Sequence, residues 1–533
     1  MNLRAISVVA VTSLVAVFAL SVPADAAEYT DLLNAADDFD DDDPETFKAW
    51  DFHIEPTFRF DYGTAQISRE APCVPQNHPS IQDNPLVDRN PRLVRDRDRC
   101  DEPRIVTNRE MDYQHTRSTV DLTLRAGLYK DLELRVTVPF VLSSTRSLKY
   151  SNEDARADRR VDENNSSVDP SNDRIRNHAE DVFSPTQSDG AYVSALDQYQ
   201  MYRFFDLGDD YSTYERSGLA DPSVGIHWAP WNDYRDDTKA TMLIGFDYTM
   251  PVAELERHDN TAVGRGIHEL AWKIAASKRF GFVEPYFGAQ YFLPIAAADT
   301  LYGKVDSGAD GRGEGQVLRN PPHKGLFTVG AEFVPYEDAE TGARYGIDLR
   351  FEFGYTSEGR DYTPLFDHMT DPDNPCNGLT LSDVRPDFDG NGNLTNPEAV
   401  ACSWVVQQPS NSSPASYDLR AAIDSDPNRE FAFTDLMSVD SYATFAGQFG
   451  LYLQPTRYFQ FRGVVGLTHH QAHLLTNART GRDTPETTTS SVDMTSGLER
   501  NPAYNPAYDN SGDRFQIERY NTWHFMVTTA LQF

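Results

Sequence analysis

The sequence predicts an all-β protein, a transmembrane antiparallel β-barrel of about twelve strands with short periplasmic turns and long extracellular loops. Three observations predict this fold class. Apolar residues recur at every second position in many segments, and no apolar run long enough for a membrane helix follows the N-terminus. Hydrophobic residues make up only 39% of the chain, although 12% of it is aromatic. Twelve strands of about ten residues place only about 120 residues in lipid, so a barrel with polar loops explains this composition.

The N-terminus is typical of an export signal. A basic start is followed by an apolar stretch over Ala5–Val22 and then by small residues that end at Ala26. This order fits a secretory signal peptide over residues 1–26, with a membrane anchor as the alternative. Residues 27–49 then form an acidic periplasmic N-terminal segment. We interpret its aspartates as a solvated linker, with cation or partner binding as the alternative.

The C-terminal segment alternates clearly. From Trp523 to Phe533 every second residue is apolar or Thr, and the chain ends on an aromatic residue. This ending resembles the terminal strand of bacterial outer-membrane β-barrels, which the barrel-assembly machinery reads. We therefore expect localisation to the bacterial outer membrane, with its lipid and the assembly machinery (through Phe533) as partners. A soluble secreted β-protein is the alternative.

The same alternation recurs along the chain. In the clearest segment, residues 345–355, aromatic and aliphatic residues interleave with charged residues and glycine. The other candidate strands are residues 52–62, 120–128, 132–142, 224–228, 242–250, 268–276, 283–295, 327–333, 445–453 and 459–467. With the C-terminal segment they make twelve, an even number.

The connections between these segments alternate between short and long. Five connections are short, and six are long and rich in Asp, Asn, Pro, Ser and Gly. The long ones cover about residues 63–115, 144–216, 254–266, 297–323, 358–436 and 475–515. Outer-membrane barrels place short turns in the periplasm and long loops outside the cell. Residues 50–533 therefore form one barrel with large extracellular loops.

The polar phase of the strands predicts the side chains that face the lumen. Residues of both charges fall on it: Arg59, Asp61, Asp121, Arg125, Glu133, Arg135, Asp247, Asp348, Arg350, Glu352 and Arg462. Such residues can line a channel or cross-link the wall across it. An eight-strand barrel is filled by side chains and a sixteen-strand barrel encloses an aqueous pore, so twelve strands predict a narrow or loop-occluded pore.

Four cysteines occur in this exported chain. We expect Cys73 to pair with Cys100, and Cys376 with Cys402, because each pair falls within one predicted loop. Closing a loop of about 26 residues removes about 3–4 kcal/mol of unfolded-state freedom. Three connectivities exist for four cysteines.

Residues 387–398 match the calcium-loop pattern D-x-[DN]-x-[DN]-G-x5-E. The spacing resembles that of an EF-hand loop, and the candidate ligands are Asp387, Asp389, Asn391, Asn393 and Glu398. Pro386 and Pro397 disfavour the flanking helices, so we expect an isolated structural Ca²⁺ loop. A cluster of turn-forming residues is the alternative.

Two stretches, Arg125–Pro139 and Ser217–Trp228, resemble an outer-membrane family linked to the meta-pathway of phenol degradation. Gly127 matches the family's turn before a strand, whereas Ala220 stands where the family has Gly. The resemblance covers about residues 117–300. It implies passage of small, hydrophobic or aromatic molecules across the outer membrane, and the very long loops depart from the family.

These features together predict a narrow channel or transporter for small solutes. The alternative is a structural or interaction barrel whose disulfide- and calcium-stabilised loops bind a surface partner. We expect no enzyme, because no Ser with a His partner forms a recognisable motif and no Asp/His cluster lies at the predicted strand ends. The net charge of -34 argues against nucleic acid as a partner.

Overall fold

The computed structural model describes the following parts of the chain: residues 52–73, 104–129, 131–150, 211–233, 236, 238–257, 260–297, 300–303, 321–338, 341–369, 395, 436–456, 458–477 and 514–532. The expected signal peptide and acidic N-terminal segment lie outside these residues. No helix in the described parts is long and apolar enough to cross a membrane.

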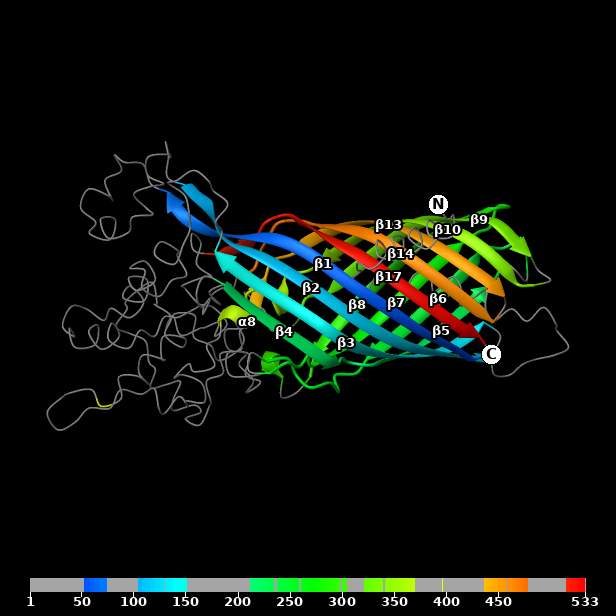
Figure 1. Cartoon of the computed structure of the whole chain (residues 1–533), viewed down its shortest axis with the longest axis horizontal. Coiled ribbons are helices and arrows are strands. Elements are labelled where there is room, and N and C mark those ends of the chain that lie inside the picture. The colour runs from blue at the N-terminus through cyan, green and yellow to red at the C-terminus, as the bar shows by residue number, and fades with distance from the viewer. Residues whose placement is uncertain are drawn as a thin grey trace, which may run out of the picture.

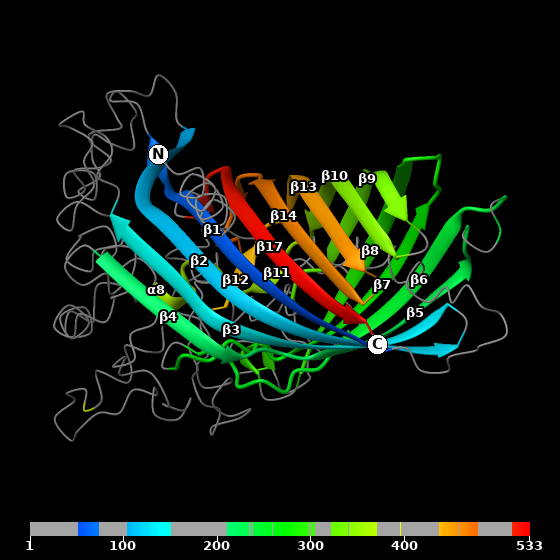
Figure 2. The ribbon, with the colours of Figure 1, turned by 45° about the vertical axis from the view of Figure 1, so that its right-hand side comes forward.

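The described strands form one closed antiparallel barrel (Figures 1 and 2). Its wall consists of β1 (Phe52–Cys73), β2 (Arg104–Tyr129), β3 (Leu132–Tyr150), β4 (Tyr211–Leu219), β5 (Ser223–Trp231), β6 (Thr241–Thr249), β7 (Ile267–Ser277), β8 (Val283–Ala296), β9 (Lys324–Asp338), β10 (Ala343–Thr356), β13 (Tyr442–Thr456), β14 (Phe459–His470) and β17 (Tyr520–Gln532). Pairing of β1 with β17 closes the barrel, so no strand edge faces lipid.

β4 and β5 together act as one strand, because both pair with β3. They are separated by Ala220, Asp221 and Pro222. Pro222 has no backbone N–H to donate, and Gly218 has a φ of 140° that a residue with a side chain rarely adopts. Counted this way, the described wall has twelve strands, and the predicted fold class is confirmed.

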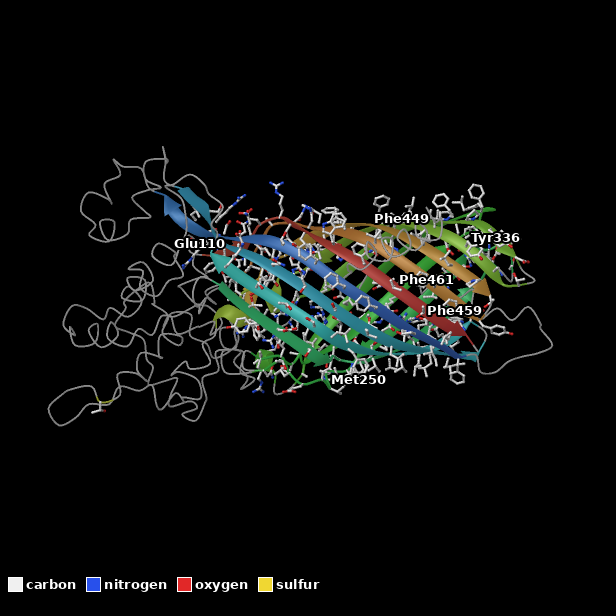
Figure 3. All side chains as sticks on the ribbon, in the orientation of Figure 1. Glu110, Met250, Tyr336, Phe449, Phe459 and Phe461 are labelled. Carbon is white, nitrogen blue, oxygen red and sulfur yellow. The ribbon has the colours of Figure 1, made fainter. Side chains whose placement is uncertain are left out.

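The outer wall carries an apolar band. On β10, Tyr345, Phe351 and Tyr355 are exposed, as are the apolar residues between them at every second position, while the alternate residues are buried. Figure 3 shows Phe449, Phe459, Phe461 and Tyr336 along the same outer wall. This band is the part of the barrel that faces lipid.

Five short turns lie at one end of the barrel, the right-hand end in Figure 1. In the turn between β2 and β3, Asp131 has a φ of 53°, a conformation that Asp tolerates better than most residues. Barrels of this kind have short turns in the periplasm. The opposite end is therefore extracellular.

β1, β2 and β3 extend further than the sequence predicted. Residues 63–73 and 104–115 were expected in a loop but form a continuous hairpin of β1 and β2, and residues 144–150 and 211–216 likewise belong to β3 and β4. The prediction was wrong there because apolar alternation is required only within lipid. Beyond Tyr62 the outer positions become polar, although the backbone pairing continues.

Part of the predicted loop 358–436 folds into the extracellular end of the barrel. We call residues 357–369 and 436–441 the mouth insertion. It contains β11 (Gly359–Asp361), α8 (Phe366–Met369) and β12 (Met437–Val439), and β11 pairs with β12 as a separate small sheet (Figure 2). A further short helix, η1 (Leu301–Gly303), and the strands β15 (His473–Leu474) and β16 (Phe515–Ile517) lie at this end.

The mouth insertion is held against the inner face of the wall by an apolar cluster. Leu365 and Met437 of the insertion belong to one cluster of buried residues with Ile67, Met111 and Leu148 of β1, β2 and β3. Leu365, Ile67, Met111 and Leu148 are fully buried. Removal of this apolar surface from water stabilises the docked insertion.

Candidate functional site

Buried ion pairs among the described residues of the lumen form several groups. In the first, the Arg125 guanidinium donates to Glu55 at 2.7 Å and to both carboxylate oxygens of Glu133 at 2.9 Å. The three residues come from β1, β2 and β3, and the side chains are 2–4% exposed. These charge-assisted hydrogen bonds link the three strands at the same height in the barrel.

The second group joins β5, β6 and β7. Asp247 accepts a bond from the Lys273 ammonium at 2.9 Å and lies 3.1 Å from His227 Nε2. Gly225 leaves the room for this carboxylate, since a Cβ at that position would lie 1.9 Å from Asp247 Oδ1.

The third group lies on β8 and β10. The Tyr286 hydroxyl donates to Asp348 at 2.7 Å and accepts from Arg350 Nε at 3.1 Å. Arg350 also pairs with Asp348 at 3.2 Å and lies 3.7 Å from Glu352. Gly330 allows the tyrosine ring to approach, because a Cβ there would lie 2.4 Å from the hydroxyl.

The eleven side chains that the sequence assigned to the lumen are buried or half-buried in the structure. It brings together Arg125 with Glu133, Arg59 with Asp121, and Arg350 with two acidic residues of its own strand. The sequence analysis did not single out Glu55, His227, Lys273 and Tyr286. The first three lie at the polar positions of their alternating strands, so the alternation alone would have identified them as lumen-facing.

At the extracellular end, two arginines of the wall bind Asp367 of the mouth insertion and Glu256 of the segment between β6 and β7. Arg146 contacts Glu256 at 2.7 Å and Asp367 at 3.1 Å. Arg216 lies 3.3 Å from Glu256 and also pairs with Asp367. Burial lowers the pKa of Arg146, but the two carboxylates outweigh burial and hold that pKa above its usual value. Arg146 therefore stays charged.

A second ion pair lies beside them. Arg265, which precedes β7, pairs with Asp361 of β11, and the Tyr302 hydroxyl donates to the same carboxylate at 3.2 Å. Burial raises the pKa of the neighbouring Tyr362 phenol well above its usual value, and Glu256 adds to the effect. The phenol is therefore a neutral hydrogen-bonding group.

A polar cavity of about 280 Å³ lies between the wall and the mouth insertion. Its lining comes from the wall, from the mouth insertion and from the segment between β6 and β7: Arg117, Ser144, Arg146, Arg216, Glu256, Val263, Arg265, Lys324, Asp361 and Tyr362. The sequence analysis missed this cavity, because most of its lining lies in segments that were predicted to be loops.

An apolar outer wall, a polar charged lumen and a closed hydrogen-bonded barrel occur together in proteins that cross the outer membrane by strands. The chain is a bacterial outer-membrane β-barrel. The ion pairs described here face the lumen or the extracellular mouth, so their charges do not contact lipid.

No protein family and no curated protein matches the barrel by sequence. Solved barrels are similar to it in shape. An outer membrane channel from Pseudomonas putida F1 aligns over 93% of this chain and 99% of its own, at 8% identity and a TM-score of 0.33. A Pseudomonas aeruginosa FadL homologue covers 90% of each chain at 8% identity and a TM-score of 0.28.

The outer membrane protease OmpT from Escherichia coli aligns over 92% of this chain and 100% of its own, at 6% identity and a TM-score of 0.25. All three likenesses are weak. The assignment to the outer membrane therefore rests on the barrel's own geometry.

Several predicted sites lie outside the described residues. These are the calcium loop except Thr395, the cysteines other than Cys73, whose side chain is also not described, and the C-terminal Phe533. Calcium binding, the disulfides and recognition by the assembly machinery remain predictions. Within the described residues, no three His, Cys, Asp or Glu side chains are grouped so as to hold a metal ion.

Proposed function

We propose that this barrel is a narrow channel or transporter for small solutes, closed in the described conformation by its mouth insertion. The observation that carries the proposal is the polar cavity between the insertion and the wall. A purely structural plug would be expected to pack against the wall without leaving a charged cavity. Here, water and a small solute have room beside ionised groups at the extracellular end.

The lumen beneath the cavity supports the same proposal. Its ion pairs place charges of both signs along the inner wall, as a polar path requires. Lys273 and Arg350 are each 1% exposed, so these charges also cross-link the wall and leave little free width. The barrel is therefore suited to small solutes and not to a wide aqueous pore.

The proposal includes no catalytic activity. Among the described residues, the arrangement most similar to a nucleophile, base and acid consists of Thr468, His524 and Asp61. The Thr468 hydroxyl is hydrogen-bonded to His524 Nε2, and His524 Nδ1 lies 3.6 Å from Asp61. Thr468 is 7% exposed and His524 is fully buried, and none of the three lines the mouth cavity. A substrate would have no access to the hydroxyl group.

The structural or interaction barrel is the rival function, and the filled lumen favours it. Conductance in a planar bilayer separates the two, with wild type compared with a variant whose insertion is destabilised. We expect small, discrete openings that become more frequent in the variant. No ion passage and no liposome swelling from correctly folded protein of either kind would overturn the channel proposal.

A further inference from the structure

The ions that line the mouth cavity, the polar cavity between the wall and the mouth insertion, are held by partners within the protein. Arg146 and Arg216 share Glu256, and both also bind Asp367, which lies behind the lining. Arg216 in addition donates to three backbone carbonyl groups of the segment between β6 and β7, at 2.9, 3.0 and 3.1 Å. The Nη1 and Nη2 groups of Arg216 are therefore occupied by the protein.

The remaining cations of the lining also have neighbours within the protein. Arg265 pairs with Asp361. Arg117 lies opposite Asp61 on the neighbouring strand, and Asp61 is the carboxylate that stabilises its charge most. Lys324 has an interaction of its own within the described part of the chain. Among the described residues, no cation of the lining is thus an isolated charge, so an entering anion would lose its hydration without a free cation to replace it.

Hydrogen-bonding capacity is nevertheless left on both kinds of ion. Arg146 binds its two carboxylates through Nη1 alone, and its Nε and Nη2 have no partner among the described residues. Glu256 and Asp361 accept their described side-chain bonds on one oxygen each, Oε1 and Oδ1, so the second oxygen of each carboxylate stays available. These atoms are not among the buried polar atoms that lack a partner, so they are accessible from the cavity.

Ser144 supplies a neutral polar group to the same cavity. Its residue is 8% exposed, and its hydroxyl has no hydrogen-bond partner among the described residues. The hydroxyl is not enclosed by protein either, so it is free to donate to a solute and to accept from it. Val263 and the ring of Tyr362 form the apolar part of the lining, and this ring packs edge-on against Phe366 with the centroids 4.7 Å apart.

We propose that the mouth cavity binds a neutral polyol of the size of one monosaccharide. Each hydroxyl of such a solute both donates and accepts, so it matches a lining of guanidinium donors, carboxylate acceptors and a serine hydroxyl. Its C–H groups suit Val263 and Tyr362. The cavity of about 280 Å³ lies just below the usual range of ligand pockets, about 300–1,000 Å³, which selects a single ring. The inference rests on the proposed function, because it makes this cavity the entry site for solute.

Calorimetry on the full-length barrel in detergent tests the class of ligand. The probes are myo-inositol and D-glucose, and the comparisons are cyclohexanol, which keeps the ring with a single hydroxyl, succinate, which is charged, and maltose, which has a second ring. We expect both polyols to bind more tightly than every comparison. Their affinity should change less than about two-fold between low and high salt, because a neutral solute forms no ion pair that salt can screen. Binding of cyclohexanol or succinate as tight as that of inositol would overturn the proposal.

Ser144→Ala tests the location of the site. It removes one neutral hydrogen bond to the solute and should weaken inositol binding about three- to ten-fold. Ser143→Ala is the matched control, because the neighbouring Ser143 hydroxyl donates to Glu215 at 3.2 Å in an exposed hydrogen bond and is not part of the lining. Inositol affinity in this control should change less than about two-fold. Equal affinities in the two variants would overturn the site.

Conductance in potassium chloride, with no polyol present, keeps this inference separate from the proposed function. A conducting barrel that binds neither inositol nor glucose overturns the polyol site and leaves the channel proposal standing. A barrel that binds inositol in a manner that depends on Ser144 but never conducts supports the site and overturns the channel.

Discussion

Replacing Leu365 with alanine is expected to open the mouth of the barrel. The Leu365 side chain is fully buried between the mouth insertion and the wall, in one cluster with Ile67, Met111 and Leu148. Those three residues belong to wall strands that remain paired when the insertion moves. The cost of the substitution therefore falls on the docked state of the insertion.

The size of the effect follows from the burial. A buried Leu→Ala substitution costs about 2–5 kcal/mol, which combines lost transfer free energy with the cavity that remains. If all of it opposes docking, the ratio of undocked to docked insertion rises about 30- to 4,000-fold. The ion pairs of Asp367 and Asp361 still favour docking, so we expect the barrel itself to stay folded.

Two assays check this prediction. Single-channel recording should show a higher open probability in Leu365→Ala than in wild type. Hydrogen exchange over residues 359–369 should become faster, and this second readout does not depend on conduction. Leu349→Ala is the control, because Leu349 is 43% exposed on the outer wall of β10 and contacts lipid. Unchanged exchange and unchanged gating in a folded Leu365→Ala variant would refute the reasoning.

Three further predictions concern stability and metal binding. Lys273→Met leaves the Asp247 carboxylate without its ammonium partner and should lower the free energy of unfolding by about 3–5 kcal/mol in urea titrations; a change below about 1 kcal/mol would contradict the buried pair. Burial, together with the charge of Arg146, lowers the pKa of His115, outside the lipid band, from 6.5 to about 4. The contribution of neutral His115 to stability is therefore complete above pH 6.5 and declines as the pH falls toward 4. In that pH window, the free energy of unfolding of His115→Gln should depend less on pH than that of wild type. An identical slope in the two proteins would argue against the prediction. Glu398→Ala should abolish calcium binding in calorimetry, and retained binding would reject the predicted loop.

The wall of the barrel was predictable because its signal is local. In residues 345–355 the polarity of each residue indicates whether it faces lipid or the lumen. The structure shows the same alternation of exposed and buried residues along β10. The interrupted strand β4–β5 was harder to predict. Only residues 224–228 showed the alternation, since most of β4 lies beyond the lipid band, where outward residues need not be apolar.

The partners of the lumen charges were less predictable than their orientation. The sequence placed Arg125 and Glu133 on the polar phase, and the short turn between β2 and β3 brings them together. Glu55 joins them from a strand that is some 70 residues away in the chain. That contact depends on the register between β1 and β2, which a polarity pattern does not specify.

The sequence by itself determined the class of the molecule, the number of strands that cross lipid and the polar phase along each strand, because each depends on a two-residue period within one strand. Tertiary structure decided what occupies the extracellular end. The mouth insertion joins residues near 360 to residues near 438. The cavity beside it gathers side chains from β2, β3, β4, β9, the segment between β6 and β7, and the mouth insertion. Closure of the barrel brings these distant segments together, and no local pattern records which of them will meet.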